Sequence, residues 1–420
     1  MYLLRTRQFL LLFLGQALNG IGSWAALVAL WGFAAYEFDS GPMQIAFIGL
    51  GWSLPAALIG PFAGVPIDRF GAKRVLVVAY AAGAGAAIAM AFADSYGQLV
   101  ALGVVHGLVK AFSMPAADTL PPRLVEDDDL LAANALLGAS SESAIVFGPL
   151  VAAAAIGLWG LRGAFLVDAA TFVIGIAVVL PLRLRHLSSR AEAADPTAEP
   201  STVWAEVREG LALVRRVPTL RFTLLLSSVV FVTWAAYVVV EPIYVRDVLG
   251  RPASFFALLQ TAFGVGLVVT GLALPRLGER VTGTRALSLS VLLSGLTAGL
   301  YVGTRNPTVA VVGVFLWGVD VAFFSAPSRT LLQRNSPPEA HGRVLALYRT
   351  AHSVADVFAL PLTGLAAGVI GVQAAALGVA SIAIVAGFIG FRSAGTQVAG
   401  LLAAGSRPDR RDPAAKSVQL

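Results

Sequence analysis

Five ionisable residues lie near the middle of long apolar runs in this sequence: Lys110, Glu142, Asp320, His352 and Asp356. A charged side chain at the centre of a membrane span costs about 2.5–3.5 kcal/mol on insertion scales, so such a residue faces a cavity or an opposite charge. Desolvation favours the neutral form of a carboxyl group, which allows a buried acid to bind a proton near neutral pH. These residue types therefore predict reversible proton binding, with Glu142 as the most informative acid.

His352 and Asp356 are four positions apart and therefore lie on one face of a helix. This spacing predicts that the two residues share a proton with Glu142, and Asp320 is the fourth candidate for proton coupling. An alternative is a hydrogen bond between helices that locks two halves of the fold together.

Membrane helices must position these residues. The chain has 420 residues, of which 57% are hydrophobic and 13% charged, whereas soluble domains carry about 25% charged residues. This composition predicts an all-α integral membrane protein. A span needs about 20 apolar residues. Runs of that length form two sets of six: 9–33, 44–66, 75–93, 98–120, 132–158 and 163–182, then 222–245, 253–275, 286–303, 308–331, 344–369 and 372–391.

Composition and motifs argue against several other classes of protein. The chain has no Cys and only 4 His, whose positions do not give the spacing of metal ligands. It contains no phosphate-binding loop of the Gly-x-x-x-x-Gly-Lys-[Ser/Thr] type, so ATP is not expected as an energy source. We expect no metal, no cofactor and no enzymatic activity.

The basic residues predict the orientation of the chain. If the N-terminus is cytoplasmic, only Arg162, Arg246, Arg251 and Arg305 of the 30 Lys and Arg residues fall on the outer side, and Lys110 lies within a helix. This distribution follows the positive-inside rule and predicts that both termini are cytoplasmic. The net charge of +6 then reflects topology, and nucleic acid is not expected as a partner.

Polar segments divide the chain into parts. In one of them, Trp204, Val207, Leu211 and Val214 recur at helical spacing, which favours an amphipathic helix. This helix either lies on the anionic inner leaflet or is a plain linker helix. The expected parts are an N-terminal six-helix bundle at 1–182, a cytoplasmic linker at 183–221, a C-terminal six-helix bundle at 222–392 and a disordered cytoplasmic tail at 393–420.

The two sets of helices have the pattern of an internal repeat. Pro115 and Pro327 are separated by 212 positions, and so are Pro149 and Pro361. A charged turn at 64–74 has a degenerate copy at 271–280, and both read Gly-x-x-x-[Asp or Pro]-Arg-x-Gly-x-[Lys or Arg]. Each copy lies between the second and third spans of its half, which predicts two pseudo-symmetric halves.

The turn at 64–74 resembles motif A of the major facilitator superfamily, and the resemblance covers nearly the whole chain. Stretches at 133–135, 165–172 and 338–344 are similar to the drug:proton antiporter-3 branch. The resemblance implies a monomer in the bilayer of a bacterial inner membrane, with two six-helix bundles that move a solute by alternating access. One departure is Ser23, which follows Gly22 where many relatives carry Asp.

In this family helices 1, 4, 7 and 10 line a central cavity, which implies that Lys110 and Asp320 lie on opposite sides of it. They either bind the two ends of a substrate or form a static buried pair. A structural role is implied for Asp168, because helix 6 is peripheral, and His106 serves either packing or binding. The cavity candidates are Gln16, Asn19, His106, Lys110, Trp234, Tyr237, Glu241 and Trp317.

The resemblance also implies that the charged turn is a gate. Asp68 is expected to face the N-terminus of helix 11, where the helix dipole favours an anion. Arg74 is expected to meet Asp118 or the acidic run at 126–129. Together these contacts hold the cytoplasmic side closed. The gating residues are Gly64, Asp68, Arg69, Gly71, Lys73, Arg74 and Asp118.

The expected function is export of an amphipathic small molecule, such as a drug, macrolide, siderophore or secondary metabolite, in exchange for protons. Uptake or facilitated diffusion of a nutrient or lipid is the alternative, and Ser23 in place of an acid leaves it open. A third alternative is a membrane receptor without transport activity, against which the cavity charges argue.

Overall fold

The computed structural model describes residues 2–185, 203–337 and 340–405. Within these residues, twelve helices are long and apolar enough to cross a membrane. The first six are α1 (Arg7–Tyr36), α2 (Pro42–Ile59), α4 (Ala72–Ala91), α5 (Tyr96–Asp118), α6 (Leu130–Trp159) and α7 (Leu161–Val179). The last six are α9 (Pro218–Ile243), α10 (Ala253–Leu277), α11 (Thr284–Val302), α12 (Pro307–Arg334), α13 (His341–Ile370) and α14 (Val372–Gly405).

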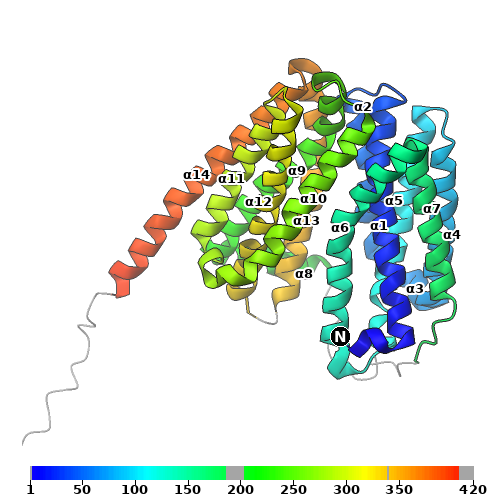
Figure 1. Cartoon of the computed structure of the whole chain (residues 1–420). Helices are drawn as coiled ribbons and strands as arrows, with labels where there is room; N and C mark the ends of the chain where they lie inside the picture. The colour runs from blue at the N-terminus through cyan, green and yellow to red at the C-terminus, as the bar shows by residue number, and fades with distance from the viewer. Residues whose placement is uncertain (1, 186–202, 338–339, 406–420) are drawn as a thin grey trace, which may run out of the picture.

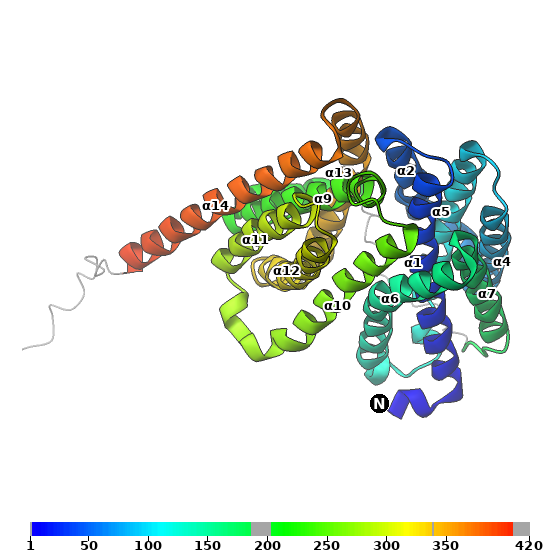
Figure 2. The same ribbon diagram turned by 45° about the horizontal axis from the view of Figure 1, so that its top comes forward.

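The helices form two bundles that lie side by side (Figure 1), so the predicted all-α architecture of two six-helix bundles is confirmed. In the first bundle α1 packs on α6 and α7, and α5 packs on α2 and α4. In the second, α11 packs on α12 and α14, and α13 packs on α9. The bundles meet chiefly through two helix pairs, α2 with α13 and α6 with α10, as the tilted view in Figure 2 shows.

The ends of the helices form two opposite sides of the molecule, which we call the linker side and the far side. The linker side carries the 3-10 helix Tyr2–Arg5, the short helices α3 (Gly64–Phe70) and α8 (Val203–Arg216), and the residues 335–337 that follow α12. The far side carries the loops at 37–41, 92–95, 249–252 and 303–306.

Most of the predicted spans agree with the helices, with three differences. The predicted span 44–66 is broken after Ile59, because Pro61 has no amide hydrogen to continue the helix. The second bundle begins at Pro218, a favourable first residue for a helix, before the predicted boundary at 222. Helix α14 runs to Gly405, so the first part of the segment predicted as a disordered tail, 393–405, is helical. The rest of that tail and residues 186–202 of the predicted linker lie outside the described residues.

Gly71 and Gly148 each allow a feature that a larger side chain would prevent. Gly71 has a φ of +85°, which glycine adopts without strain, and it reverses the chain between α3 and α4. At Gly148 in α6, a Cβ atom would collide with Cβ of Trp24 and would lie 3.0 Å from the carbonyl oxygen of Ile21. The absence of a side chain therefore lets α1 and α6 approach closely.

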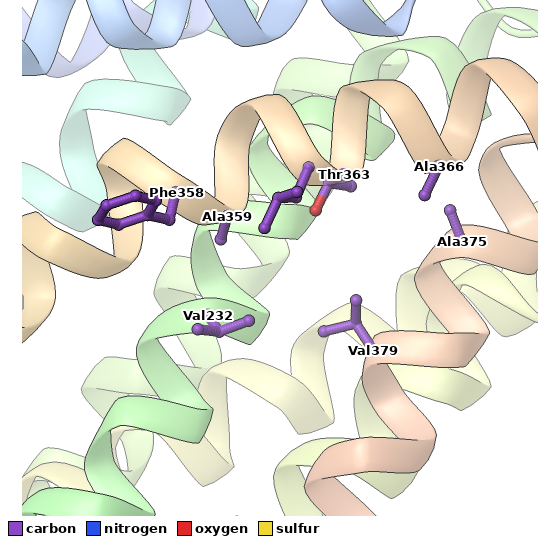
Figure 3. A pocket seen from close by; sticks show the side chains of 8 residues that line it. Val232, Phe358, Ala359, Thr363, Ala366, Ala375 and Val379 are labelled. Carbon is purple, nitrogen blue, oxygen red and sulfur yellow. The ribbon is translucent and has the colours of Figure 1, made fainter.

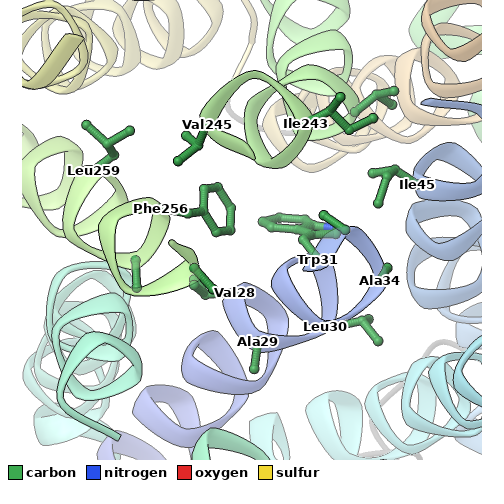
Figure 4. Packing of buried hydrophobic residues seen from close by; sticks show 14 of the residues in the cluster. Val28, Ala29, Leu30, Trp31, Ala34, Ile45, Ile243, Val245, Phe256 and Leu259 are labelled. Carbon is green, nitrogen blue, oxygen red and sulfur yellow. The ribbon is translucent and has the colours of Figure 1, made fainter. Parts of the chain in front are cut away.

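The largest apolar cluster joins the two bundles on the far side. It includes Trp31 of α1 and Phe256 of α10, which point toward each other in Figure 4. The other apolar clusters of the described residues each lie within one bundle, and their members are on the linker side or at mid-depth. The two bundles are thus sealed together on the far side, and no apolar cluster of the described residues seals them on the linker side.

The close contact of α1 and α6 predicts that Gly148→Val destabilises the protein. The added side chain meets the backbone of α1, and overpacking of this kind costs about 1–3 kcal/mol. The measurement is the Tm of the purified protein in detergent. Gly138→Val is the matched control, because a Cβ atom at Gly138, in the same helix, meets no atom within 4 Å. Equal Tm values for the two variants would contradict the close packing.

Candidate functional site

One arginine ties the second bundle to the end of α1 on the far side. Arg246 lies in the π-helical turn Tyr244–Val248, which continues α9. Its Nη1 atom is 2.8 Å from Oδ1 of Asp39, and it also donates hydrogen bonds to the carbonyl oxygens of Ala35 and Ser40. The Nε and Nη2 atoms donate to the carboxylate of Asp247 at 2.6 and 3.0 Å. One guanidinium group therefore contacts both bundles.

A second polar contact crosses the same boundary. The hydroxyl of Tyr36, the last residue of α1, donates to the carbonyl oxygen of Arg251 at 2.7 Å. The Asp39 side chain is 91% exposed, and ion pairs at exposed positions contribute about 0–1 kcal/mol. Large apolar side chains such as Trp31 and Phe256 contribute about 1.5–3 kcal/mol each when they are withdrawn from water. The apolar cluster is therefore the main seal, and the polar contacts fix how the two bundles align.

A buried acid and several aromatic rings form a cluster in the second bundle, which we call the Glu241 cluster. Glu241 of α9 is 4% exposed and accepts a hydrogen bond of 2.6 Å from Nε2 of Gln260 in α10. The ring of Trp317 in α12 lies 4.8 Å from the ring of Tyr237 and 6.4 Å from that of Tyr301, measured between centroids. Three of the predicted cavity residues, Tyr237, Glu241 and Trp317, thus come together.

Several polar atoms in this region have no hydrogen-bond partner among the described residues. They are Oε1 of Glu241, the hydroxyl oxygens of Tyr237 and Tyr301, and both carboxylate oxygens of Asp320, which is 3% exposed. Buried polar groups are nearly always satisfied, so unpaired ones inside a membrane span mark candidate positions for protons, water or a ligand. Gln260 and Tyr301 were not predicted as site residues. A polar Gln260 within an otherwise apolar run was the available signal.

A second cluster, which we call the His106 cluster, lies in the first bundle. His106 of α5 and Asp168 of α7 are both fully buried, and Nδ1 of His106 is 3.9 Å from Oδ2 of Asp168. The ring of Trp52 from α2 stacks on His106, with 4.1 Å between centroids. The Nζ atom of Lys110 is 5.5 Å from the centre of the Trp52 ring.

This geometry excludes one predicted alternative and adds a contact of Asp168 that was not predicted. Lys110 and Asp320 form no ion pair with each other among the described residues, so the static buried pair predicted as an alternative is not present. Lys110 instead lies in the His106 cluster. Asp168, predicted to be structural because helix 6 is peripheral, faces a titratable residue of α5. The packing of α7 on α1 and α4, which the apolar pattern cannot specify, brings Asp168 to this position.

The remaining ionisable candidates lie apart from these two clusters. His352 of α13 packs on Phe231 and Trp234, with 4.6 and 5.9 Å between ring centroids. Its neighbour Asp356 is half-buried, and the two form no ion pair among the described residues. Gln16 and Asn19 of α1 are half-buried. The side chain of Glu142 lies outside the described part of the structure, so its predicted role stays a prediction.

The charged turn of motif A has mostly exposed side chains. Lys73 donates to the carbonyl oxygens of Leu180 and Leu182 at 2.6 and 2.9 Å, and so satisfies groups at the end of α7. Asp68 and Arg74 are exposed and make no ion pair in the described part of the chain. The predicted contact of Arg74 with Asp118 is therefore not made in this conformation, as expected if the linker side is open.

The linker helix α8 packs on the second bundle. Val214 is buried against Leu332 and Val344, and a carboxylate oxygen of Glu209 is 2.9 Å from Nη1 of Arg343 at the start of α13. The described part of this helix thus behaves as a linker helix docked on protein. The side chains of Trp204 and Val207, and residues 338–339 of the motif at 338–344, lie outside the described residues.

An apolar cleft of about 270 Å³ lies between α9, α13 and α14 (Figure 3). Val232, Ala359 and Thr363 line it, and Phe358 and Leu362 at its margin are exposed. None of the predicted cavity residues lines this cleft, so it is separate from the Glu241 and His106 clusters.

Comparisons with known proteins agree with this architecture. The sequence matches the Major Facilitator Superfamily over residues 12–252 and 223–416. It is 24% identical to an uncharacterized MFS-type transporter, YfiS, of Bacillus subtilis over 380 residues, 89% of this chain and 90% of the relative. It is 25% identical to macrolide efflux protein A of Streptococcus pyogenes over 373 residues, 87% of this chain and 91% of the relative.

The fold is also similar to that of a solved transporter. The crystal structure of the nucleoside transporter NupG superposes with a TM-score of 0.69 and 14% identity, covering 93% of this chain and 99% of that one. A match at this identity shows the fold alone. Together with the family match over nearly the whole chain, the paired bundles and the twelve spans establish that this protein belongs to the Major Facilitator Superfamily and is a membrane transporter.

Proposed function

We propose that this transporter exports an amphipathic small molecule by alternating access, in exchange for protons that flow inward. The observation that carries the proposal is the unequal closure of the two sides: an apolar cluster joins the bundles on the far side, whereas Asp68 and Arg74 of motif A on the linker side make no ion pair among the described residues. The similarity to macrolide efflux protein A supports export. The proposed substrate class is an amphipathic compound such as a macrolide or another drug.

The positive-inside pattern supports the proposal that the linker side faces the cytoplasm of a bacterial cell. In this proposal the structure represents the inward-open state of a monomer in the inner membrane. A substrate enters between the bundles from the cytoplasm and reaches residues of α1, α5, α9 and α12. Export requires that the apolar seal of Trp31 and Phe256 separates and that the linker side closes.

Buried acids provide the coupling. A carboxyl group withdrawn from water is most stable when it is protonated. Asp320 and Glu241 are 3% and 4% exposed and have unpaired oxygens among the described residues, and a basic or polar substrate group can replace a proton at such a site. Glu142, His352 and Asp356 remain proposed participants in the same exchange. Competition between substrate and proton for one carboxylate is sufficient to couple their opposite movements.

Uptake or facilitated diffusion is the second candidate function. Ser23 stands in α1 where an acid occurs in many relatives, and a carrier without coupled protons does not need one. Because the chain belongs to a family of transporters, a receptor without transport activity is the weakest of the three alternatives.

Inverted membrane vesicles with an acidic interior are expected to accumulate a radiolabelled macrolide or another amphipathic compound of a test panel. Both Asp320→Asn and Glu142→Gln are expected to reduce accumulation by about tenfold or more, because each removes a proton-binding group. Dissipating the pH gradient with an ionophore is the control. If no compound of the panel moves with the gradient, or if both variants keep coupled transport, the proposed coupling is wrong.

In the Arg246→Gln variant, the far side is expected to open more often than in the wild-type protein. The chain has no Cys, so a single Ala34→Cys substitution introduces one reactive thiol at a position that is fully buried in the far-side seal. A membrane-impermeant maleimide is added from the periplasmic side, and the rate at which it reacts with this thiol reports how often the far side opens. Loss of charge-assisted hydrogen bonds worth about 1–2 kcal/mol predicts a labelling rate about five- to thirtyfold higher.

Arg305→Gln serves as the control for this change, because Arg305 is an exposed far-side arginine without an ion pair among the described residues. An unchanged labelling rate in the Arg246→Gln background would show that the guanidinium group does not hold the far side closed.

Asp68→Asn is expected to abolish transport while folding and ligand binding are retained. Asp68 is exposed on the linker side. In the proposed inward-open state its replacement leaves the structure intact, but no anion meets the N-terminus of α13 when that side closes. Transport, Tm and binding of the transported compound are compared with those of Asp94→Asn, an exposed far-side control. Normal transport by Asp68→Asn would remove the proposed gating role.

A further inference from the structure

Four buried polar atoms without hydrogen-bond partners lie next to one another in the first bundle. They are the two ring nitrogens of His106 and the two carboxylate oxygens of Asp168, and no partner for them occurs among the described residues. Both side chains are 0% exposed. Each unsatisfied buried polar group costs about 1–3 kcal/mol, so a fold that retains four of them in one place needs a compensating role for them.

The surroundings hold the imidazole ring in place. Trp52 stacks on one face at 4.1 Å with an interplanar angle of 15°, and the ring of Phe172 lies 5.6 Å away in an edge-on arrangement. With its orientation fixed, Nδ1 of His106 remains directed toward Oδ2 of Asp168 at 3.9 Å. This separation is about 1 Å longer than a charge-assisted hydrogen bond of about 2.7–2.9 Å.

We propose that His106 and Asp168 form a proton-binding site, in which one bound proton joins Nδ1 of His106 to the carboxylate of Asp168. When the site is empty, His106 is neutral and Asp168 carries the negative charge, and Lys110 is a cation of the same cluster that forms no ion pair with Asp168 among the described residues. When one proton binds, an O–H bond of hydronium breaks and leaves water as an N–H bond forms on Nδ1 of the imidazole, and the resulting imidazolium donates a hydrogen bond to the carboxylate. The inference rests on the proposed exchange of substrate for protons, and it identifies a site at which a proton binds.

The other helices around the pair contribute little competing charge. Helices α1 and α2 carry no charged residue near this depth, and α4 contributes the neutral Tyr80, which packs on Phe172 at 5.6 Å. Helix α6 carries Glu142, whose side chain lies outside the described residues. Lys110, one turn from His106 on α5, is thus the charged residue of the cluster besides the pair itself, and it forms no ion pair with Asp168 among the described residues.

Shortening of the His106–Asp168 distance draws α5 and α7 together, and α7 is in direct contact with α1. A Cβ atom at Gly22 of α1 would collide with Thr171, whose hydroxyl donates to the carbonyl oxygen of Asp168 at 2.8 Å. Helix α1 also carries Trp31 of the far-side seal. Proton binding at this site is therefore connected through α1 to the contact that must open for export.

Trp52 fluorescence tests the site directly, because a stacked imidazolium quenches indole emission more than a neutral imidazole does. The protein is purified, reconstituted in nanodiscs and titrated across the range in which an imidazole changes charge, about pH 5 to pH 8. The signal of Trp52→Phe is subtracted to isolate Trp52. We expect a reversible titration that disappears in His106→Gln. In Asp168→Asn the midpoint of the titration is expected to move to lower pH, because this variant has no carboxylate to stabilise the imidazolium. His352→Gln is the control and keeps the titration.

A variant that retains the native site avoids dependence on mutants that fail to fold. The chain contains 4 His, so replacing His186, His341 and His352 with Gln leaves His106 as the only imidazole, which NMR of isotopically labelled histidine then follows alone. An imidazole that stays neutral over the whole range, or a Trp52 titration unaffected by His106→Gln, overturns the site. If the titration is present but no pH gradient drives transport, the proton site stands and the proposed antiport fails.

Discussion

The cost of placing a charge in a bilayer is the constraint on which the rest of this structure depends. Ionisable residues in the membrane spans are few, and the described ones that lie near mid-depth gather in the protein interior. His106, Lys110 and Asp168 lie together in the first bundle, and Glu241 lies with three aromatic rings in the second. In both clusters some buried polar atoms have no hydrogen-bond partner among the described residues, and this is the basis for proposing that the clusters exchange protons or bind a solute.

The two bundles are held together unequally, and this asymmetry connects the clusters to movement. Apolar packing around Trp31 and Phe256 supplies most of the closure on the far side, and Arg246 aligns the helix ends through carbonyl oxygens of Ala35 and Ser40. On the linker side, Asp68 and Arg74 are exposed in the described structure. In a transporter the two bundles must be able to separate on the closed side. Apolar packing with only a few polar contacts between the bundles meets this requirement.

Much of the fold could be predicted from the sequence because it depends on local composition. The lengths of the apolar runs and the repeated turn at 64–74 and 271–280 were sufficient to predict twelve spans in two bundles. The break after Ile59 and the helical extension of α14 to Gly405 were missed, since apolar composition does not report where a helix bends or how far it continues.

The site was less predictable because it depends on how distant helices are rotated against each other. Tyr237, Glu241 and Trp317 were predicted and do come together, but Gln260 and Tyr301 were missed. The pairing of His106 with Asp168 needs the packing of α5 beside α7, and the contacts of Arg246 with Ala35 and Ser40 need the placement of one bundle on the other. No periodicity within a single helix contains this information.

Distances between spin labels on both sides of the protein test the central claim most directly. The chain has no Cys, so label pairs can be introduced at exposed positions Val65 and Arg276 on the linker side and at Asp94 and Arg305 on the far side. Between low and high pH, and on addition of a transported compound, the account predicts that the two distances change in opposite directions. Two distances that stay fixed, or that lengthen and shorten together, would contradict alternating access between these two sides.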